Sequence, residues 1–145
     1  MKVQDAMTRD VELMTPEKSI CDAAKKMREE AIGALPVGEN DRLVGMITDR
    51  DITVRAVALE RDPKTTKIRD VMSEKVCYCF EDDTLQKAAT IMSEHQVKRL
   101  PVLNRNKRLA GVISLADLEL NEPEAAQIAL QGISRSTGEA RQMAH

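Results

Sequence analysis

Apolar residues recur at helical spacing in two separated stretches of the chain, 20–27 and 85–92. In each stretch they stand at positions i, i+3, i+4 and i+7, the stripe expected of a half-buried helix. Ser19 and Thr84 come directly before these stretches and are predicted N-caps. The stripe positions are Ile20, Ala23, Ala24 and Met27 in the first stretch, and Leu85, Ala88, Ala89 and Met92 in the second.

Short apolar runs around these helices predict strands. Pro36 and Pro101 mark their runs as edges or ends of a sheet, because proline cannot donate to a strand ladder. Turn-like segments at 38–41 and 104–107 then lead into possible hairpin partners, and a second helix begins at Asp49 or Leu115. The expected strands are Val11–Met14, Leu35–Val37 and Leu43–Thr48, then Val76–Phe80, Leu100–Val102 and Leu109–Ser114.

The two halves of the chain are copies of one unit. Residues 3–37 laid over 68–102, an offset of 65, give ten identities in 35 positions, and a one-residue insertion then carries the match onward at offset 66. Each copy reads strand, helix, strand, strand, helix. This predicts two β-α-β-β-α repeats packed sheet to sheet, since one such unit alone is at the lower limit for stability.

The repeats predict the domain organisation: a first domain at 1–60, a polar linker at 61–67, a second domain at 68–121, and a helix and tail at 122–145. The short C-terminal helix is expected over 122–132, and 134–145 shows no periodicity and is expected to fray. The expected apolar side of that helix is Ala125, Ala126, Ile128, Ala129 and Leu130.

Composition narrows the functional classes. Twenty-two Lys and Arg stand against 24 Asp and Glu, and aromatic residues make up 1% of the chain, which argues against nucleic-acid binding. No apolar run is long enough to span a bilayer, and residues 1–20 lack the apolar core of a secretory signal, so we expect a cytoplasmic location and no membrane partner.

The motifs of both copies resemble a tandem pair of CBS domains, a Bateman module, over nearly all of residues 1–120. The pattern is most similar to stand-alone bacterial CBS-pair proteins of the hypoxic-response or general-stress type. The first copy carries Asp5-Ala6-Met7-Thr8, Gly33-Ala34-Leu35-Pro36-Val37 and Gly45-Met46-Ile47-Thr48-Asp49-Arg50-Asp51. The second carries Asp70-Val71-Met72-Ser73, Lys98-Arg99-Leu100-Pro101-Val102 and Gly111-Val112-Ile113-Ser114-Leu115-Ala116-Asp117.

This resemblance implies an α+β fold, pseudo-two-fold symmetry between the repeats and homodimers that form a flat disc. It also implies binding of AMP, ADP or ATP, less often S-adenosylmethionine or NAD(H), in the cleft between the repeats. Each site is then completed by the other copy: the Asp51 site by Lys98 and Arg99, and the Asp117 site by Gly33 and Ala34.

Residue chemistry fits such a ligand. Thr48 ends a strand where backbone N–H groups of a following helix can meet phosphate, and the Asp51 carboxylate can accept both hydroxyls of a ribose. Gly45 permits close backbone approach. The same spacing is also a helix-capping signature, so capping is the other interpretation of Thr48 and Asp51, and both roles can hold.

The two sites differ in charge, because Lys98 and Arg99 supply two cations to the first and the second receives none. The first site is expected to hold a phosphate chain, and the second to be empty or to take a less charged ligand. A solvated basic edge is the other interpretation of the two cations. The predicted first site is Thr48, Asp51, Lys98 and Arg99, with Val76, Cys77 and Pro101 beside the base; the weaker second site is Ser114, Asp117, Val11 and Pro36.

Cysteines offer a different chemistry. Cys77 and Cys79 are expected on one face of a strand with His95 on the next helix, and Cys21 or His145 is a distant fourth ligand for zinc. A Cys-x-Cys pair lacks the spacing of a zinc knuckle, so we predict no metal site.

The sequence thus predicts a non-catalytic sensor module that binds an adenosine nucleotide as regulatory ligand, and signals through conformation or dimerisation, with a separate protein partner possible. Alternatives are a structural dimer with vestigial sites, a nucleotide-hydrolysing enzyme and a cysteine–metal redox sensor.

Overall fold

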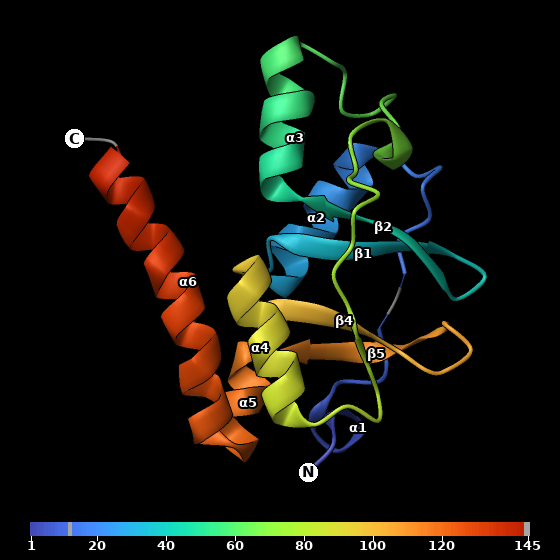
Figure 1. Ribbon diagram of the computed structural model, residues 1–145. Coiled ribbons are helices and arrows are strands. Elements are labelled where there is room, and N and C mark those ends of the chain that lie inside the picture. Colours follow the sequence, from blue (N-terminus) through green and yellow to red (C-terminus); the bar gives the residue numbers. More distant parts are fainter. Residues whose placement is uncertain (12, 144–145) are drawn as a thin grey trace. The chain divides into compact units, whose positions relative to one another are not determined.

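Helices and short strands alternate along the chain (Figure 1). The computed structural model describes residues 1–11 and 13–143, with side chains up to residue 135. The α+β class with two repeated halves is confirmed. The helices and strands are α1 (Val3–Ala6), α2 (Ile20–Glu30), β1 (Ala34–Glu39), β2 (Arg42–Thr48), α3 (Asp49–Arg55), the 3₁₀ helices η1 (Val57–Leu59) and η2 (Ile68–Asp70), β3 (Cys79–Phe80), α4 (Leu85–His95), β4 (Arg99–Leu103), β5 (Leu109–Ser114), α5 (Leu115–Asn121) and α6 (Pro123–Met143).

The amphipathic helices α2 and α4 form where the apolar spacing predicts them. Ser19 and Thr84 each accept a hydrogen bond from the backbone N–H three residues further on, at 3.1 Å, so both N-caps are confirmed. The predicted stripe of α4 is buried throughout, but in α2 Ala24 is exposed whereas its counterpart Ala89 is buried. The cause is α6, which packs along α4.

The strands form two separate small sheets. β1 and β2 make an antiparallel hairpin, and so do β4 and β5, with β3 added in parallel to β4. The prediction of strands around 35–37, 43–48, 100–102 and 109–114 is therefore confirmed.

The first predicted strand of each repeat is shorter than expected. Of Val76–Phe80 only Cys79 and Phe80 form β3. Among the described residues of 11–14, only Met14 pairs, through a single bridge to Val37. In the second repeat the backbone N–H of Glu81 donates to the carbonyl of Leu103 at 2.9 Å and continues the pairing. Pro16 stands at the equivalent place and has no N–H to donate, so the first repeat stops after one bridge.

Pro101 lies inside β4, the central strand, rather than at an end. β3 pairs only with the next two residues of β4, Val102 and Leu103, so no strand lies along that side of Pro101. The proline therefore removes no ladder bond there. Pro36 lies in β1 of the two-stranded sheet and is paired with Met46.

The one-residue insertion between the repeats lies in the hairpin loops. β1 and β2 are joined by Asn40 and Asp41, both with positive φ (51° and 65°), the conformation of the tight hairpin turn that asparagine and aspartate favour. The second hairpin has the longer loop, in which the Asn104 side chain accepts from two backbone N–H groups, at 2.9 and 3.0 Å.

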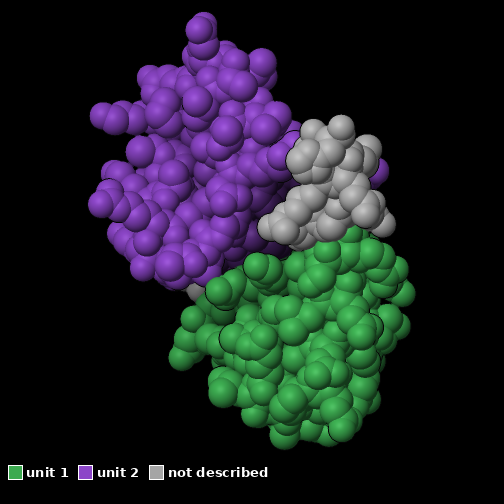
Figure 2. Space-filling view, turned by 90° about the vertical axis from the view of Figure 1, so that its left-hand side faces the viewer, with its two compact units in different colours: residues 1–11, 77–145 green, residues 12–76 purple. Residues whose placement is uncertain are grey.

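Two compact units form, and neither coincides with one of the sequence repeats. One unit combines residues 1–11 with 77–145, and the other comprises 12–76 (Figure 2). Each repeat begins with a lead-in segment, residues 3–11 in the first repeat and the equivalent residues 68–76 in the second. Each lead-in segment packs in the unit of the other repeat. Thr8 pairs with Val112 of β5, and the equivalent Ser73 pairs with Met46 of β2, each through two backbone hydrogen bonds of 2.9 Å.

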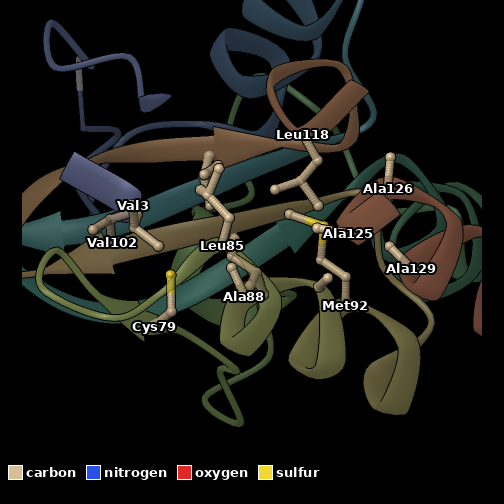
Figure 3. Close-up of a cluster of buried hydrophobic side chains, with 13 residues drawn as sticks. Val3, Cys79, Leu85, Ala88, Met92, Val102, Leu118, Ala125, Ala126 and Ala129 are labelled. Atoms are coloured by element: carbon tan, nitrogen blue, oxygen red, sulfur yellow. The ribbon is translucent and has the colours of Figure 1, made fainter. Parts of the chain in front are cut away.

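The exchanged lead-in segments contribute to both hydrophobic cores. Val3 of α1 is fully buried in the core of the first unit, together with β3–β5, α4, α5 and α6 (Figure 3). In the other unit Ile68 and Val71 are fully buried beside α2 and the β1–β2 hairpin. The polar segment 61–67 also packs locally, because the carbonyls of Pro63 and Thr66 accept from the first N–H groups of α2.

Two equivalent glycines admit the lead-in segments. A Cβ at Gly45 would lie 2.7 Å from the carbonyl oxygen of Ser73, and one at Gly111 would lie 2.4 Å from that of Thr8. Real Cβ atoms do not approach backbone so closely. The close approach predicted at Gly45 is therefore real, but the approaching group is the chain's own backbone.

The C-terminal helix differs from its prediction in length and in its apolar side. α6 continues to Met143 instead of ending near 132, so the expected fraying of 134–143 is wrong, and residues 144–145 lie outside the described chain. It packs against α4 and α5. Ala125, Ala126 and Ala129 are buried as predicted, but Ile128 and Leu130 are exposed.

Small residues let α6 approach α4 closely. A Cβ at Gly132 would lie 2.5 Å from the backbone carbonyl oxygen of Ser93, so glycine is required at this crossing. Among the described residues no helix combines the length and apolarity needed to cross a membrane.

We expect Gly45→Ala and Gly111→Ala each to lower the free energy of unfolding by roughly 1–3 kcal/mol, because the added methyl pushes a paired lead-in segment off its strand. Gly33→Ala is the matched control. Its Cβ would meet the exposed side chain of Asp49, at 2.8 Å from Oδ2, which can move aside, so the change should stay within about 0.5 kcal/mol. Urea denaturation measures the free energy of unfolding of all three variants. Wild-type stability of both Gly45→Ala and Gly111→Ala would contradict the exchange of lead-in segments.

Candidate functional site

Thr48 and Asp51 lie together at the junction of β2 and α3. The Thr48 Oγ1 accepts from the Asp51 N–H at 3.0 Å, and the Asp51 Oδ2 accepts from the Thr48 N–H at 3.0 Å. This reciprocal pair is a capping box, so the capping interpretation is confirmed. Both residues are half-buried, and the other Asp51 oxygen, Oδ1, takes no hydrogen bond from the described part of the chain.

Ser114 and Asp117 repeat this arrangement at the junction of β5 and α5. The Ser114 Oγ accepts from the Asp117 N–H at 3.2 Å, and the Asp117 Oδ2 accepts from the Ser114 N–H at 2.8 Å. Each motif therefore holds one carboxylate rigidly at a helix start. A second oxygen is left to accept a hydrogen bond, which suits a ligand hydroxyl.

The first N–H groups of α3 already donate to acceptors of the chain itself, so their contact with a phosphate stays a prediction. The N–H of Asp49 donates to the Gly33 carbonyl at 2.9 Å, that of Arg50 to the Asp49 Oδ1 at 2.8 Å, and that of Asp51 to Thr48. Asp49 is the residue that the sequence reasoning missed. The alignment of the two repeats contained the signal, because the acidic Asp49 aligns with the apolar Leu115 of the second copy.

The hairpin register places the predicted cations beside the second motif. Arg99, the first residue of β4, pairs with Ser114, and the carbonyl of Lys98 accepts from the Leu115 N–H at 2.8 Å. Both side chains are exposed. Within one unit the structure therefore brings together Lys98, Arg99, Ser114 and Asp117.

In the first repeat the equivalent neighbours carry no cation. Ala34 pairs with Thr48, and Gly33 precedes it. The exposed carboxylate of Asp49 adds a negative charge beside Thr48. The two motifs therefore share a geometry but differ in the charges beside them within their own units. The sequence assigns Lys98 and Arg99 to the Asp51 site, and that assignment stays a prediction.

The residues expected beside the base lie apart from the capping motifs in the chain. Pro36 and Pro101 are buried within β1 and β4, whereas Val11, Val76 and Cys77 are half-buried in the segments that precede Met14 and β3. Val76 and Cys77 fall on either side of the boundary between the two compact units. Their contact with a base stays a prediction.

The cysteine pair is not arranged as a strand would place it, because Cys77 precedes β3 and only Cys79 belongs to it. Burial raises the pKa of Cys79 to about 12, helped by the nearby Asp83 and Cys77, and burial also raises the pKa of Cys77. Both thiols therefore favour the protonated form, whereas zinc binds thiolate.

His95 is the exposed last residue of α4, and His145 lies outside the described residues. Within the part of the chain that the structure describes, no three His, Cys, Asp or Glu side chains gather as a metal site requires.

Comparison with known proteins identifies the repeat. The family model described as CBS domain matches residues 3–57 and again 68–119. Among curated proteins, YlbB of Bacillus subtilis (strain 168) is 39% identical over 137 residues, covering 92% of this chain and 91% of its own. Hypoxic response protein 1 of Mycobacterium tuberculosis is 37% identical over 124 residues, 85% of this chain and 86% of its own.

Solved structures of CBS-domain proteins also match the fold of this chain. The crystal structure of Hypoxic Response Protein I with two coordinated zinc ions matches with a TM-score of 0.76 and 35% identity, covering 83% of this chain and 98% of that one. The CBS domain pair of protein MJ0100, solved with 5′-methylthioadenosine and S-adenosyl-L-methionine, matches with a TM-score of 0.71 and 26% identity over 83% of this chain and 98% of that one.

The raised pKa of Cys79 predicts how stability depends on pH. The folded state keeps its proton up to about pH 12, whereas an unfolded thiol loses it near pH 9, so this stabilisation is complete below pH 9 and is lost between pH 9 and about 12. We expect the free energy of unfolding of the wild type to fall more steeply from pH 9 to 11 than that of Cys79→Ala, measured by urea denaturation. Parallel slopes would show that Cys79 is not held protonated by the fold.

Proposed function

Because the chain belongs to the CBS-domain family and carries two repeats, we propose that it is a non-catalytic regulatory module that binds an adenosine nucleotide, AMP, ADP or ATP. The supporting observation is the pair of rigid capping carboxylates, Asp51 and Asp117, each with one oxygen left for a ligand hydroxyl. A solved CBS pair with adenosyl compounds bound supports the ligand class.

We assign ribose to the carboxylates and phosphate to the cations. In the first site Asp51 accepts from the ribose hydroxyls, while Lys98 and Arg99 attract the phosphate chain. These two cations are exposed, and no ion pair occupies them within the described residues. Thr48 holds Asp51 in place, and Val76, Cys77 and Pro101 are the proposed neighbours of the base.

The second site, Ser114 and Asp117 with Val11 and Pro36, is proposed to bind more weakly. We propose that occupancy is passed on through the conformation or self-association of the protein, as a homodimer in the cytoplasm. A ligand can shift such an equilibrium only by its difference in affinity for the two states. The similarity to a hypoxic response protein supports a role in stress response.

A structural dimer with vestigial sites is the second candidate. It is favoured by the first turn of α3, where the chain's own groups already accept from the N–H groups that phosphate would use. In that case Thr48 and Asp51 serve only the helix.

Calorimetric titration with AMP, ADP and ATP tests the proposal, with Asp51→Asn and Asp51→Ala as variants. Asparagine keeps an acceptor for the Thr48 N–H but loses the charge, so it should preserve the cap and weaken nucleotide binding by about 10- to 100-fold. Alanine should abolish binding and also cost roughly 1 kcal/mol of stability. No heat at millimolar nucleotide would reject the sensor and leave the structural dimer.

The variants Lys98→Gln and Arg99→Gln test the assignment of the phosphate chain to these two cations. Each should lower affinity for ATP by about tenfold or less and leave affinity for adenosine unchanged, since only the phosphates meet the cations. Lys25→Gln on the exposed side of α2 is the charge-matched control. Equal loss for ATP and adenosine would show that the two cations do not meet phosphate.

A further inference from the structure

Each lead-in segment places a methionine against a glycine of the strand with which it pairs. Met7 and Met72 occupy equivalent positions of the two repeats, at offset 65. A Cβ at Gly111 would lie 3.1 Å from the sulfur of Met7, and one at Gly45 would lie 2.9 Å from the sulfur of Met72. Each sulfur therefore fills space that the missing glycine side chain leaves open. The contact recurs at both junctions, so it belongs to the duplicated unit.

These two methionines stand at the border between core and solvent. Met7 packs against the core of its unit, as Met72 does in the other unit, but both residues are only half-buried. Three other methionines are buried: Met14, Met27 and Met92. A thioether in a half-buried side chain is open to oxidants dissolved in water, whereas one inside a closed core is protected. The two junctions therefore offer thioethers that an oxidant can reach and that the packing also uses.

Oxidation to a sulfoxide would place a polar oxygen where the neighbouring backbone donors are already engaged. The residue that follows each methionine, Thr8 or Ser73, pairs with its strand through two hydrogen bonds of 2.9 Å. The N–H groups of Met7 and Met72 donate to the carbonyls four residues earlier, at 3.0 and 2.9 Å. A sulfoxide oxygen pressed against the glycine would receive no hydrogen bond from these groups, and it becomes hydrated only when the side chain leaves the strand.

We propose that Met7 and Met72 are oxidation sites at which a hydroperoxide releases the lead-in segments from their strands. The O–O bond of the hydroperoxide breaks and an S=O bond forms, so the sulfur is oxidised and the peroxide is reduced to an alcohol, or to water where it is hydrogen peroxide. A methionine sulfoxide reductase reverses the step with two thiols, which become a disulfide while the oxygen leaves as water. The proposal goes beyond the proposed nucleotide binding and does not depend on it.

Release would act on the strands that carry the two capping motifs. Val112 pairs with the first lead-in segment and stands two residues before Ser114. Met46 pairs with the second lead-in segment and stands two residues before Thr48. With the lead-in segment released, each of these strands keeps only its hairpin partner along this stretch. One oxidised sulfur thereby loosens both a core and the strand end that positions a capping carboxylate.

The test compares the melting temperature of the wild type with that of the combined variant Met7→Leu, Met72→Leu, before and after treatment with hydrogen peroxide. Leucine is apolar and similar in volume, so the untreated variant should melt within about 4 °C of the wild type. Peroxide should lower the melting temperature of the wild type by roughly 5 °C or more, and that of the leucine variant by less than about 2 °C. Each single leucine variant should lose about half of the wild-type shift.

Peptide mass spectrometry of the treated wild type locates the added oxygen. Sulfoxide should accumulate at Met7 and Met72 before it appears at the buried methionines. Oxidation of the buried methionines first, or sulfoxide at both junctions with an unchanged melting temperature, would overturn the proposal. Reduction of both sulfoxides by methionine sulfoxide reductase should then restore the melting temperature, and no recovery would show damage in place of a reversible switch.

Matched variants separate these methionines from other oxidisable groups. Met46→Leu removes the remaining half-buried methionine among the described side chains and should keep the full peroxide response. All leucine variants retain the three cysteines, so a shift that persists in the combined variant would assign the effect to another group and overturn the proposal. Without any oxidant, Met7→Gln and Met72→Gln should each lower the melting temperature more than leucine does at the same position, because the amide is polar. Equal melting of the glutamine and leucine variants would show that the junctions tolerate a polar group.

Discussion

The pairing of each lead-in segment with the second hairpin strand of the other repeat is the constraint on which the rest of the fold depends. Gly45 and Gly111 stand where a carbonyl of the lead-in segment approaches too closely for any Cβ. Each lead-in segment also contributes buried residues, Val3 to one core and Ile68 and Val71 to the other. The core of each unit therefore contains residues from both repeats. Neither repeat has its complete core without the other. This explains how units of about 55–60 residues, at the lower limit for independent stability, become stable as a pair.

The same strands lead from this constraint to the candidate sites. Thr48 follows Gly45 by three residues and Ser114 follows Gly111 by three, so the glycine fixes the strand and the strand delivers the capping hydroxyl. The reciprocal hydrogen bonds then hold the carboxylate one helical turn further on. Capping and the proposed ligand binding therefore use one geometry. The cap occupies one carboxylate oxygen, and the orientation that it imposes makes the other oxygen a fixed acceptor.

The helices and the capping motifs were predictable from the sequence because their signals are local. Helix spacing, the Ser19 and Thr84 caps and the Thr-x-x-Asp box depend on residues within one or two turns of each other, and the structure confirms all three. Pairing between distant segments was not predictable in the same way. The exchanged lead-ins, the strand cut short at Pro16 and the use of Gly45 by the chain itself each require knowing which segment lies alongside. α6 was underestimated because its contact with α4 uses small residues such as Gly132, which leave no apolar periodicity to detect.

The differences between the repeats follow from what each second helix carries at its start. Asp49 satisfies the Arg50 N–H in the first repeat, whereas Leu115 at the same place cannot, so the Ala116 N–H takes no partner from the described chain. The first repeat thus gains a carboxylate near its motif where the second gains Lys98 and Arg99. The duplicated backbone keeps both carboxylates in one geometry, and single substitutions around it give one motif a negative and the other a positive surrounding. That division of charge would let two equivalent motifs make different demands on an anionic ligand, since the geometry of acceptance is common to both and only the field around it differs.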